Sequence, residues 1–200
     1  MIGLVGGLLY LPSSVFLDTW AIPYLKVAHG MTAHAAARAV SLMFLGWIIA
    51  SLASGFISDW IGNRRMPLLI AGMSSFVCSL VLLYVPGLSS AAVMAVMFLF
   101  GLCCGPHPLC FTLSKEMCAA EIAGTGISFA NFIIMMGGFV FQPVVGKLLD
   151  VMRGGRVLDG HPLYTVSDFH WALLIMPVGL IVAYLLTLTI KDTYHSAVDN

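Results

Sequence analysis

The chain has 200 residues, of which 60% are hydrophobic and only 9% are charged, and its formal net charge is zero. A water-soluble domain carries about a quarter charged residues to keep its surface hydrated, so this composition excludes that class of protein. The neutral balance and the lack of a basic run offer no surface for nucleic acid, and we expect no nucleic-acid partner.

Apolar runs of near twenty residues recur along the chain, which is the length a helix needs to cross roughly 30 Å of hydrocarbon. The pattern predicts six transmembrane helices in a lipid bilayer, as an all-α integral membrane bundle that forms one domain over residues 1–200. We place the spans at about residues 2–25, 38–58, 67–85, 90–114, 122–149 and 169–190.

Short polar segments separate the predicted spans. Residues 29–38 form the link between the first two, and Ser89 or Ser90 is the expected N-cap of the fourth span. Ser167 or Asp168 should cap the sixth span, and residues 193–200 form a polar tail. The chain opens directly on an apolar helix, which indicates a segment of something longer or a half-length gene product.

Four of the five cysteines fall inside apolar spans, and Cys118 lies just past the end of one. A secreted disulfide framework would place them in loops, so we interpret them as packing residues with free thiols. The four in the spans are Cys78, Cys103, Cys104 and Cys110.

The link between the second and third spans contains a spaced set of glycines and charges: Gly55, Asp59, Gly62, Arg64 and Arg65. Gly55 can let helices approach closely, Asp59 can lie near a helix N-terminus, and Gly62 permits a tight turn. The two arginines can bind carboxylates or lipid headgroups. The alternative interpretation is an ordinary basic turn between two spans.

This link closely resembles the signature loop of the major facilitator superfamily, G-x-x-x-D-x-x-G-x-[RK]-[RK]. In that family the loop joins the second and third helices of each six-helix half on the cytoplasmic side. The balance of lysines and arginines between the two faces hardly discriminates here, so the orientation rests on this resemblance.

A second copy of the pattern follows the fifth span, where Gly146 and Asp150 repeat the Gly-x-x-x-Asp spacing before Arg153. Each copy lies at the C-terminal end of the second helix of a three-helix unit. The sequence therefore predicts two inverted repeats, over about residues 1–87 and 88–192, the arrangement known for transporter halves.

Two further stretches, residues 20–25 and 137–150, resemble the seventh and eleventh helices of the superfamily. The resemblance implies the C-terminal half of a secondary transporter in a bacterial inner membrane, moving a small polar metabolite with a proton or cation. Its partner would be a missing N-terminal six-helix half or a second copy of the chain. The rival is a six-helix membrane protein that does not transport, such as an assembly factor or a decayed gene fragment.

Asp18 is an ionisable residue within the first span, where a charge costs roughly 2.5–3.5 kcal/mol on insertion scales. It is a candidate proton or cation carrier, or else an interfacial residue that caps the helix or pairs with Lys26. Helical spacing places Asp18 on one face with Tyr10 and Ser14. In a transporter we expect that polar stripe to line the pathway.

The stripe should face His107 in the fourth span and Asn131 in the fifth. His107 lies between Pro106 and Pro108, and its imidazole either satisfies a carbonyl that the prolines leave free or contacts the substrate. Asn131 and Gln142 are either hydrogen-bonding contacts between helices or groups of a polar pocket.

Glu116 resembles the acidic residue that some superfamily members pair with signature-loop arginines. The resemblance implies a cytoplasmic gate latch of Asp59, Arg64 or Arg65, and Glu116, and the alternative is a solvated charge. The chain lacks metal-ligand spacing, a nucleophile elbow and a phosphate loop, so we expect no metal, no cofactor and no enzyme.

Overall fold

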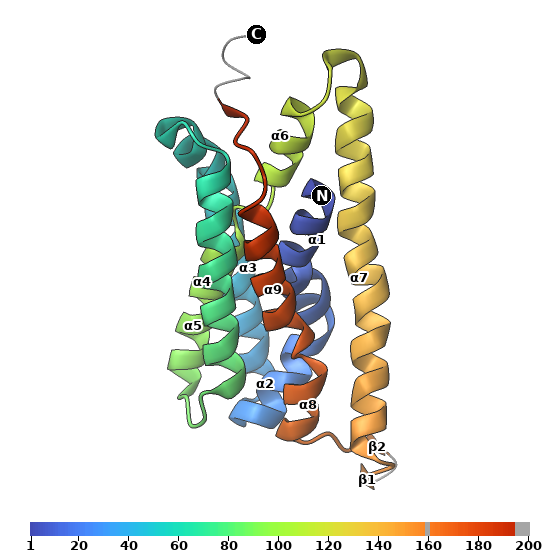
Figure 1. Cartoon of the computed structure of the whole chain (residues 1–200). Helices are drawn as coiled ribbons and strands as arrows, with labels where there is room; N and C mark the ends of the chain where they lie inside the picture. The colour runs from blue at the N-terminus through green and yellow to red at the C-terminus, as the bar shows by residue number, and fades with distance from the viewer. Residues whose placement is uncertain (159–160, 195–200) are drawn as a thin grey trace.

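The computed structural model describes residues 1–158 and 161–194. Within these residues it forms a bundle of six helical spans that are long and apolar enough to cross a membrane (Figure 1). This confirms the predicted fold class and the number of spans. The spans are Ile2–His29, Ala33–Ile61, Arg65–Tyr84, Ser90–Glu116, Ala120–Arg153 and Val166–Thr187.

Figure 1 shows the start of α1, the α3–α4 turn and the end of α9 at one end of the bundle, drawn at the top. We call this the upper end. The α4–α5 link and the connection after α7 lie at the other end, the lower end.

The first span is one continuous rod made of α1 (Ile2–Leu11), η1 (Pro12–Trp20) and α2 (Ala21–His29). The central segment η1 is a wide, π-type helix that begins at Pro12. Proline lacks the N–H that would continue the α-helical ladder, and π-type turns are frequent at functional sites.

The second span, α3 (Ala33–Ile61), begins five residues before the predicted position. Its N-cap is Thr32, whose side chain accepts a hydrogen bond from the Ala35 N–H at 3.2 Å. The polar stretch over residues 29–38 is therefore mostly helix, because this cap overrides the local drop in hydropathy. The third span is α4 (Arg65–Tyr84).

The fourth span is broken. Ser89 caps α5 (Ser90–Cys104), as predicted, and α6 (Leu109–Glu116) follows after a four-residue turn over residues 105–108. The turn holds Pro106 and Pro108, so two backbone donors are missing there. The fifth span consists of the short η2 (Ala120–Ile122) and the long α7 (Ala123–Arg153).

A two-stranded antiparallel ladder of β1 (Val157–Leu158) and β2 (His161–Pro162) lies in the connection to the sixth span. That span consists of α8 (Val166–Ala172) and α9 (Ile175–Thr187). Its N-cap is Thr165, in a reciprocal capping box with Asp168. The predicted cap at Ser167 or Asp168 was wrong, because Asp168 serves as the third helical residue of the box.

The closest helix packing joins α3 to α5. A Cβ added at Gly101 would clash with the Met43 carbonyl oxygen, and one added at Gly46 would clash with that of Phe98. Small residues let transmembrane helices approach to backbone contact, where van der Waals packing is strongest. This glycine seam holds α5 in place just before the broken segment.

Burial is uneven across the spans. The first span is mostly buried, whereas the second and fifth are mostly exposed. Large apolar side chains dominate these exposed faces, and Trp60 at the end of α3 is 88% exposed. The faces suit hydrocarbon or another apolar helix bundle. The most exposed apolar residues of α3 and α7 are Leu52, Phe56, Trp60, Phe129, Phe132 and Phe139.

Candidate functional site

An arginine at the upper end joins elements that are far apart in the sequence. Arg64, just before α4, donates from Nε to Glu116 Oε1 at 3.1 Å and from Nη1 to Ser58 Oγ at 3.1 Å. It also forms an ion pair with Asp59. The side chains of Arg64 and Glu116 are only 13% and 11% exposed, so this contact between α6 and the α3–α4 turn is largely shielded from solvent.

The C-terminal segment adds to this contact, which sequence reasoning missed because the segment is polar and follows the last span. Thr193 donates its hydroxyl hydrogen to Glu116, and the Tyr194 hydroxyl donates to the Asp59 carbonyl at 3.1 Å. The Tyr194 ring also lies 5.0 Å from the Arg64 guanidinium. We call the set of Asp59, Arg64, Glu116, Thr193 and Tyr194 the Arg64 cluster.

Arg64 stays charged within this cluster. Burial works to lower its pKa, but the hydrogen bonds and negative charges of Asp59 and Glu116 outweigh that effect and raise the pKa above its ordinary value. The cluster therefore holds a permanent cation against two carboxylates.

Arg65 has different partners, so of the two arginines Arg64 is the one that meets Glu116. The Arg65 guanidinium donates from Nε to the Thr187 carbonyl at 3.0 Å, at the end of α9. Its backbone N–H donates to Asp192 Oδ2 at 3.0 Å. Arg65 thus satisfies free carbonyls at a helix C-terminus, where a cation is stabilised by the helix dipole.

The two glycines of the loop differ. Gly62 has φ +67°, the left-handed conformation that a tight turn requires, as predicted. At Gly55 no atom lies within 4 Å of a built Cβ among the described residues. The close helix approach expected there is not made by any described residue, and the glycine seam between α3 and α5 lies elsewhere.

The second copy of the motif forms a separate cluster at the lower end. Arg153 lies 3.6 Å from Asp150 across one helical turn, and Tyr164 donates to Asp150 at 3.1 Å. Arg156 holds Asp168 with two hydrogen bonds of 2.8 and 2.6 Å. The Arg156–Asp168 pair ties the connection to the start of α8, and sequence reasoning did not foresee it.

The broken fourth span places His107 in an aromatic environment. The imidazole is 4% exposed and stacks on the Tyr10 ring at 4.8 Å with 20° between the planes. Phe111 meets it edge-on at 5.8 Å, and the Trp47 ring lies 6.4 Å away. Three elements, α1, α3 and α6, thus converge on one histidine.

Neither ring nitrogen of His107 has a hydrogen-bond partner among the residues that the structure describes, and the same holds for the Trp47 indole N–H. The interpretation that His107 satisfies a carbonyl freed by the prolines is therefore wrong. Leaving a buried polar group unpaired costs about 1–3 kcal/mol, so such groups in a native protein call for an explanation.

Ser14 and Gln142 connect the first and fifth spans. The Ser14 hydroxyl donates to the Tyr10 carbonyl at 3.1 Å, and the Gln142 side-chain amide donates to the Ser14 carbonyl. A Cβ built at Gly138 would lie 3.1 Å from the Ser14 side chain, so α7 packs closely here. Gln142 is thus a hydrogen-bonding contact between helices.

Asp18 and Asn131 are exposed in this chain. Neither side chain makes a hydrogen bond or ion pair within residues 1–158 and 161–194, and Lys26 does not pair with Asp18. The structure therefore brings Tyr10 against His107 and Ser14 against α7, but leaves Asp18 and Asn131 on the surface.

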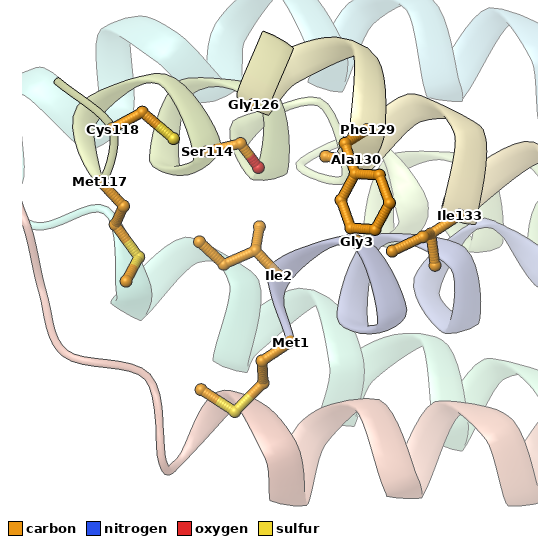
Figure 2. A pocket seen from close by; sticks show the side chains of 10 residues that line it. All are labelled: Met1, Ile2, Gly3, Ser114, Met117, Cys118, Gly126, Phe129, Ala130 and Ile133. Atoms are coloured by element: carbon orange, nitrogen blue, oxygen red, sulfur yellow. The ribbon is translucent and has the colours of Figure 1, made fainter. Parts of the chain in front are cut away.

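A recess of about 230 Å³ opens at the upper end between α1, α6 and α7. Figure 2 shows mainly apolar side chains around it, with the Ser114 hydroxyl and the Cys118 thiol on one side. This lining suits hydrocarbon better than a polar solute. No group of three or more potential metal ligands occurs in the part of the chain that the structure describes.

Comparisons with known proteins agree with this architecture. Residues 2–183 match the family model described as "Sugar (and other) transporter". No curated protein matches the chain. Among solved structures, the chain is similar to the inward-open xylose transporter XylE from E. coli, with a TM-score of 0.73 and 16% identity over 97% of this chain.

A second similar structure is the proton:xylose symporter XylE bound to 6-bromo-6-deoxy-D-glucose, with a TM-score of 0.71 and 17% identity over 96% of this chain. The chain spans about half of these transporters, 48% and 44% of their lengths. At this low sequence identity, the structural similarity to XylE shows only that the fold is shared. Family membership is shown by the family model that matches residues 2–183. The chain therefore belongs to the sugar (and other) transporter family.

Proposed function

We propose that the chain is one six-helix half of a secondary active transporter that moves a small polyhydroxylated solute of the sugar class. The observation that carries this proposal is His107, a buried imidazole whose two nitrogens have no partner among the described residues, at the break of a transmembrane span. Broken helices near the middle of the bilayer form the solute sites of many transporters.

The chemistry of the His107 environment suits a sugar. A neutral imidazole offers one donor and one acceptor, and the Trp47 N–H is a further donor. A sugar hydroxyl both donates and accepts, so it satisfies these groups, while the Tyr10 and Phe111 rings provide apolar faces for the C–H surfaces of the ring. Binding would thus satisfy groups that lack a partner within the described residues.

The second half of the transporter would cover the exposed faces of α3 and α7, which carry large apolar side chains. We propose that the partner is either a separate N-terminal six-helix half or a second copy of this chain, in a bacterial inner membrane. The resemblance of residues 20–25 and 137–150 to C-terminal helices supports the first option. Exposure of Asp18 and Asn131 is compatible with a pathway that the second half completes.

Asp18 is the proposed proton or cation carrier, since it is an acid within a membrane span that has no ion-pair partner among the described residues. In the complete transporter, Asp18→Asn should abolish gradient-driven accumulation while exchange of solute continues, because the amide cannot take up a proton. Asp150→Asn is the matched control outside the pathway. Normal accumulation by the transporter with the Asp18→Asn substitution would eliminate Asp18 as the carrier.

The Arg64 cluster is the proposed gate latch, on the cytoplasmic side if the loop has its family orientation. It joins the α3–α4 turn of the first repeat to α6 of the second, so separating the two units would break it. An ion pair of this kind contributes little to folding, and its role would lie in favouring one gate state.

The test is a ligand screen on the purified chain, followed by uptake assays on the complete transporter. Pentoses or hexoses should raise the melting temperature of the wild-type chain, and His107→Leu should abolish the shift. Phe139→Leu, on the exposed face of α7 and outside the His107 environment, should retain it. The proposal is contradicted if no sugar raises the melting temperature of the chain and the complete transporter takes up no sugar. Both results together would favour a six-helix protein without transport activity.

A further inference from the structure

Two cysteine side chains meet between α4 and α5. The Sγ atoms of Cys78 and Cys103 lie 3.8 Å apart, and both residues are half-buried. Cys104 and Cys110 are buried, and the Cys104 thiol is hydrogen-bonded to the Ser75 hydroxyl at 3.4 Å. Cys78 and Cys103 are therefore the more accessible thiols on these helices, and they face each other.

The geometry is close to that of a disulfide. An S–S bond is about 2.05 Å long, so the sulfurs have to approach by roughly 1.8 Å, and rotation about the two Cα–Cβ bonds is the motion that would bring them together. The adjacent contact of Ser75 with Cys104 holds the two helices in register at this level.

We propose that Cys78 and Cys103 form a redox-modified pair, which a hydroperoxide oxidises to a disulfide that locks α4 to α5. One thiolate sulfur attacks the terminal oxygen of the hydroperoxide, breaks the O–O bond and becomes a sulfenic acid, and the alkoxide leaves as an alcohol after protonation. The second thiolate then attacks that sulfur and releases hydroxide, which is protonated to water. The two thiols lose two electrons, and the peroxide gains them.

The position of the pair gives this bond a structural consequence. Cys103 lies two residues before Gly105, where α5 gives way to the turn that carries His107. The Gly105 carbonyl already accepts a hydrogen bond from Ser51 of α3 at 3.0 Å. A disulfide to α4 would add a covalent restraint on the other side, so the end of α5 could not shift relative to its neighbours. Oxidation should therefore prevent movement of the turn over residues 105–108 relative to α4.

The test treats the whole purified chain, in lipid nanodiscs, with tert-butyl hydroperoxide, and then identifies linked peptides by mass spectrometry under non-reducing conditions. We expect one bond, between Cys78 and Cys103, that dithiothreitol reverses. Cys78→Ser and Cys103→Ser should each abolish it, whereas Cys104→Ser, the neighbouring control, should leave it unchanged. Sulfinic acids without a link, or a bond that pairs Cys78 with Cys104, would overturn the proposal.

The effect on transport rests on the proposed function and is measured separately. In the complete transporter, hydroperoxide should lower the uptake rate, dithiothreitol should restore it, and Cys78→Ser should remove the sensitivity. If the disulfide forms without any change in uptake, the proposed effect on transport is refuted. The proposal that Cys78 and Cys103 are oxidised to a disulfide is then still supported. Absence of uptake before oxidation would instead count against the transport proposal.

Discussion

The two copies of the Gly-x-x-x-Asp motif have the same spacing but different partners. At the upper end, Arg64 pairs with Asp59 of its own loop and with Glu116, which is 52 residues away. At the lower end, Arg153 pairs with an acid one turn earlier on α7, and Arg156 pairs with Asp168 at the start of the next helix. The first cluster is long-range and the second is local.

The difference shows that the motif alone does not determine a latch. The first copy joins distant units because α6 ends beside it and supplies Glu116. Among the described residues, the second copy receives its ion-pair acids only from α7 and α8, so it ties a connection to its own helices. We therefore expect the upper cluster to respond to conformational change and the lower one to act mainly in stability.

The largest expected effect concerns sidedness, because it is all or none. If the two copies lie on opposite faces of the membrane, single cysteines placed at Asn63 and at Val157, in a cysteine-free background, should react with an impermeant maleimide from opposite sides. Gly160, which the sequence alone suggests for the second position because it lies in the polar link between the fifth and sixth spans, is outside the described residues. Labelling of both positions from one face would refute the six-span topology. It would also refute the placement of the two motif copies on opposite faces of the membrane.

The next effect concerns stability at the lower end. Asp168→Asn should lower the free energy of unfolding by about 1–3 kcal/mol, because the substitution removes a charge-assisted bond to Arg156 from a carboxylate that is only 7% exposed. Asp150→Asn is the control, since the Asp150 side chain is 54% exposed and its pair should contribute about 0–1 kcal/mol. Chemical unfolding in detergent measures both. Equal losses would show that burial of Asp168 has no energetic importance.

A smaller effect is expected for the Arg64–Glu116 pair, measured as a coupling energy. A double-mutant cycle with Arg64→Gln and Glu116→Gln should give about 1 kcal/mol, because both side chains are largely buried. The same cycle on Arg153 and Asp150 should give less than about 0.5 kcal/mol. A coupling near zero for the upper pair would mean that the contact is incidental and would remove the basis of the latch.

The smallest effect separates the two glycines that open the motif copies. A Cβ at Gly146 would lie 3.3 Å from the Trp20 ring, whereas one at Gly55 meets no atom within 4 Å among the described residues. Alanine stabilises a helix by about 0.5–1 kcal/mol relative to glycine. Gly55→Ala should therefore raise the melting temperature of the isolated chain slightly, and Gly146→Ala should leave it nearly unchanged. A lower melting temperature for Gly55→Ala would reveal close packing at Gly55 that the described residues do not make.

Much of the architecture was predictable, because hydropathy and helix length are local properties. The six spans and the cap at Ser89 follow from residues next to each other in the chain. The starts of α3 and α8 were predicted too late, since Thr32 and Thr165 form their caps outside the apolar runs. A threonine before an apolar run is a signal that could have placed both.

The sites were predictable only in part. Family resemblance predicted that Arg64 or Arg65 would lie near Glu116. The structure has that contact at Arg64, and nothing in the sequence separated the two arginines. Thr193 and Tyr194 follow the last apolar run, so their return to the cluster depends on how α9 ends. The unpaired nitrogens of His107 depend on which of the described helices surround the break.

Amino-acid order alone thus determined that the chain crosses a membrane as six helices, since the cost of exposing polar backbone to hydrocarbon leaves few alternatives. It also marked the charged turns and the proline-flanked histidine as unusual. Only the tertiary structure decided which partners these residues have, or lack, within the described part of the chain. Ion pairs and unsatisfied groups are set by the few ångströms between side chains of different helices, and that distance follows from packing such as the α3–α5 glycine seam.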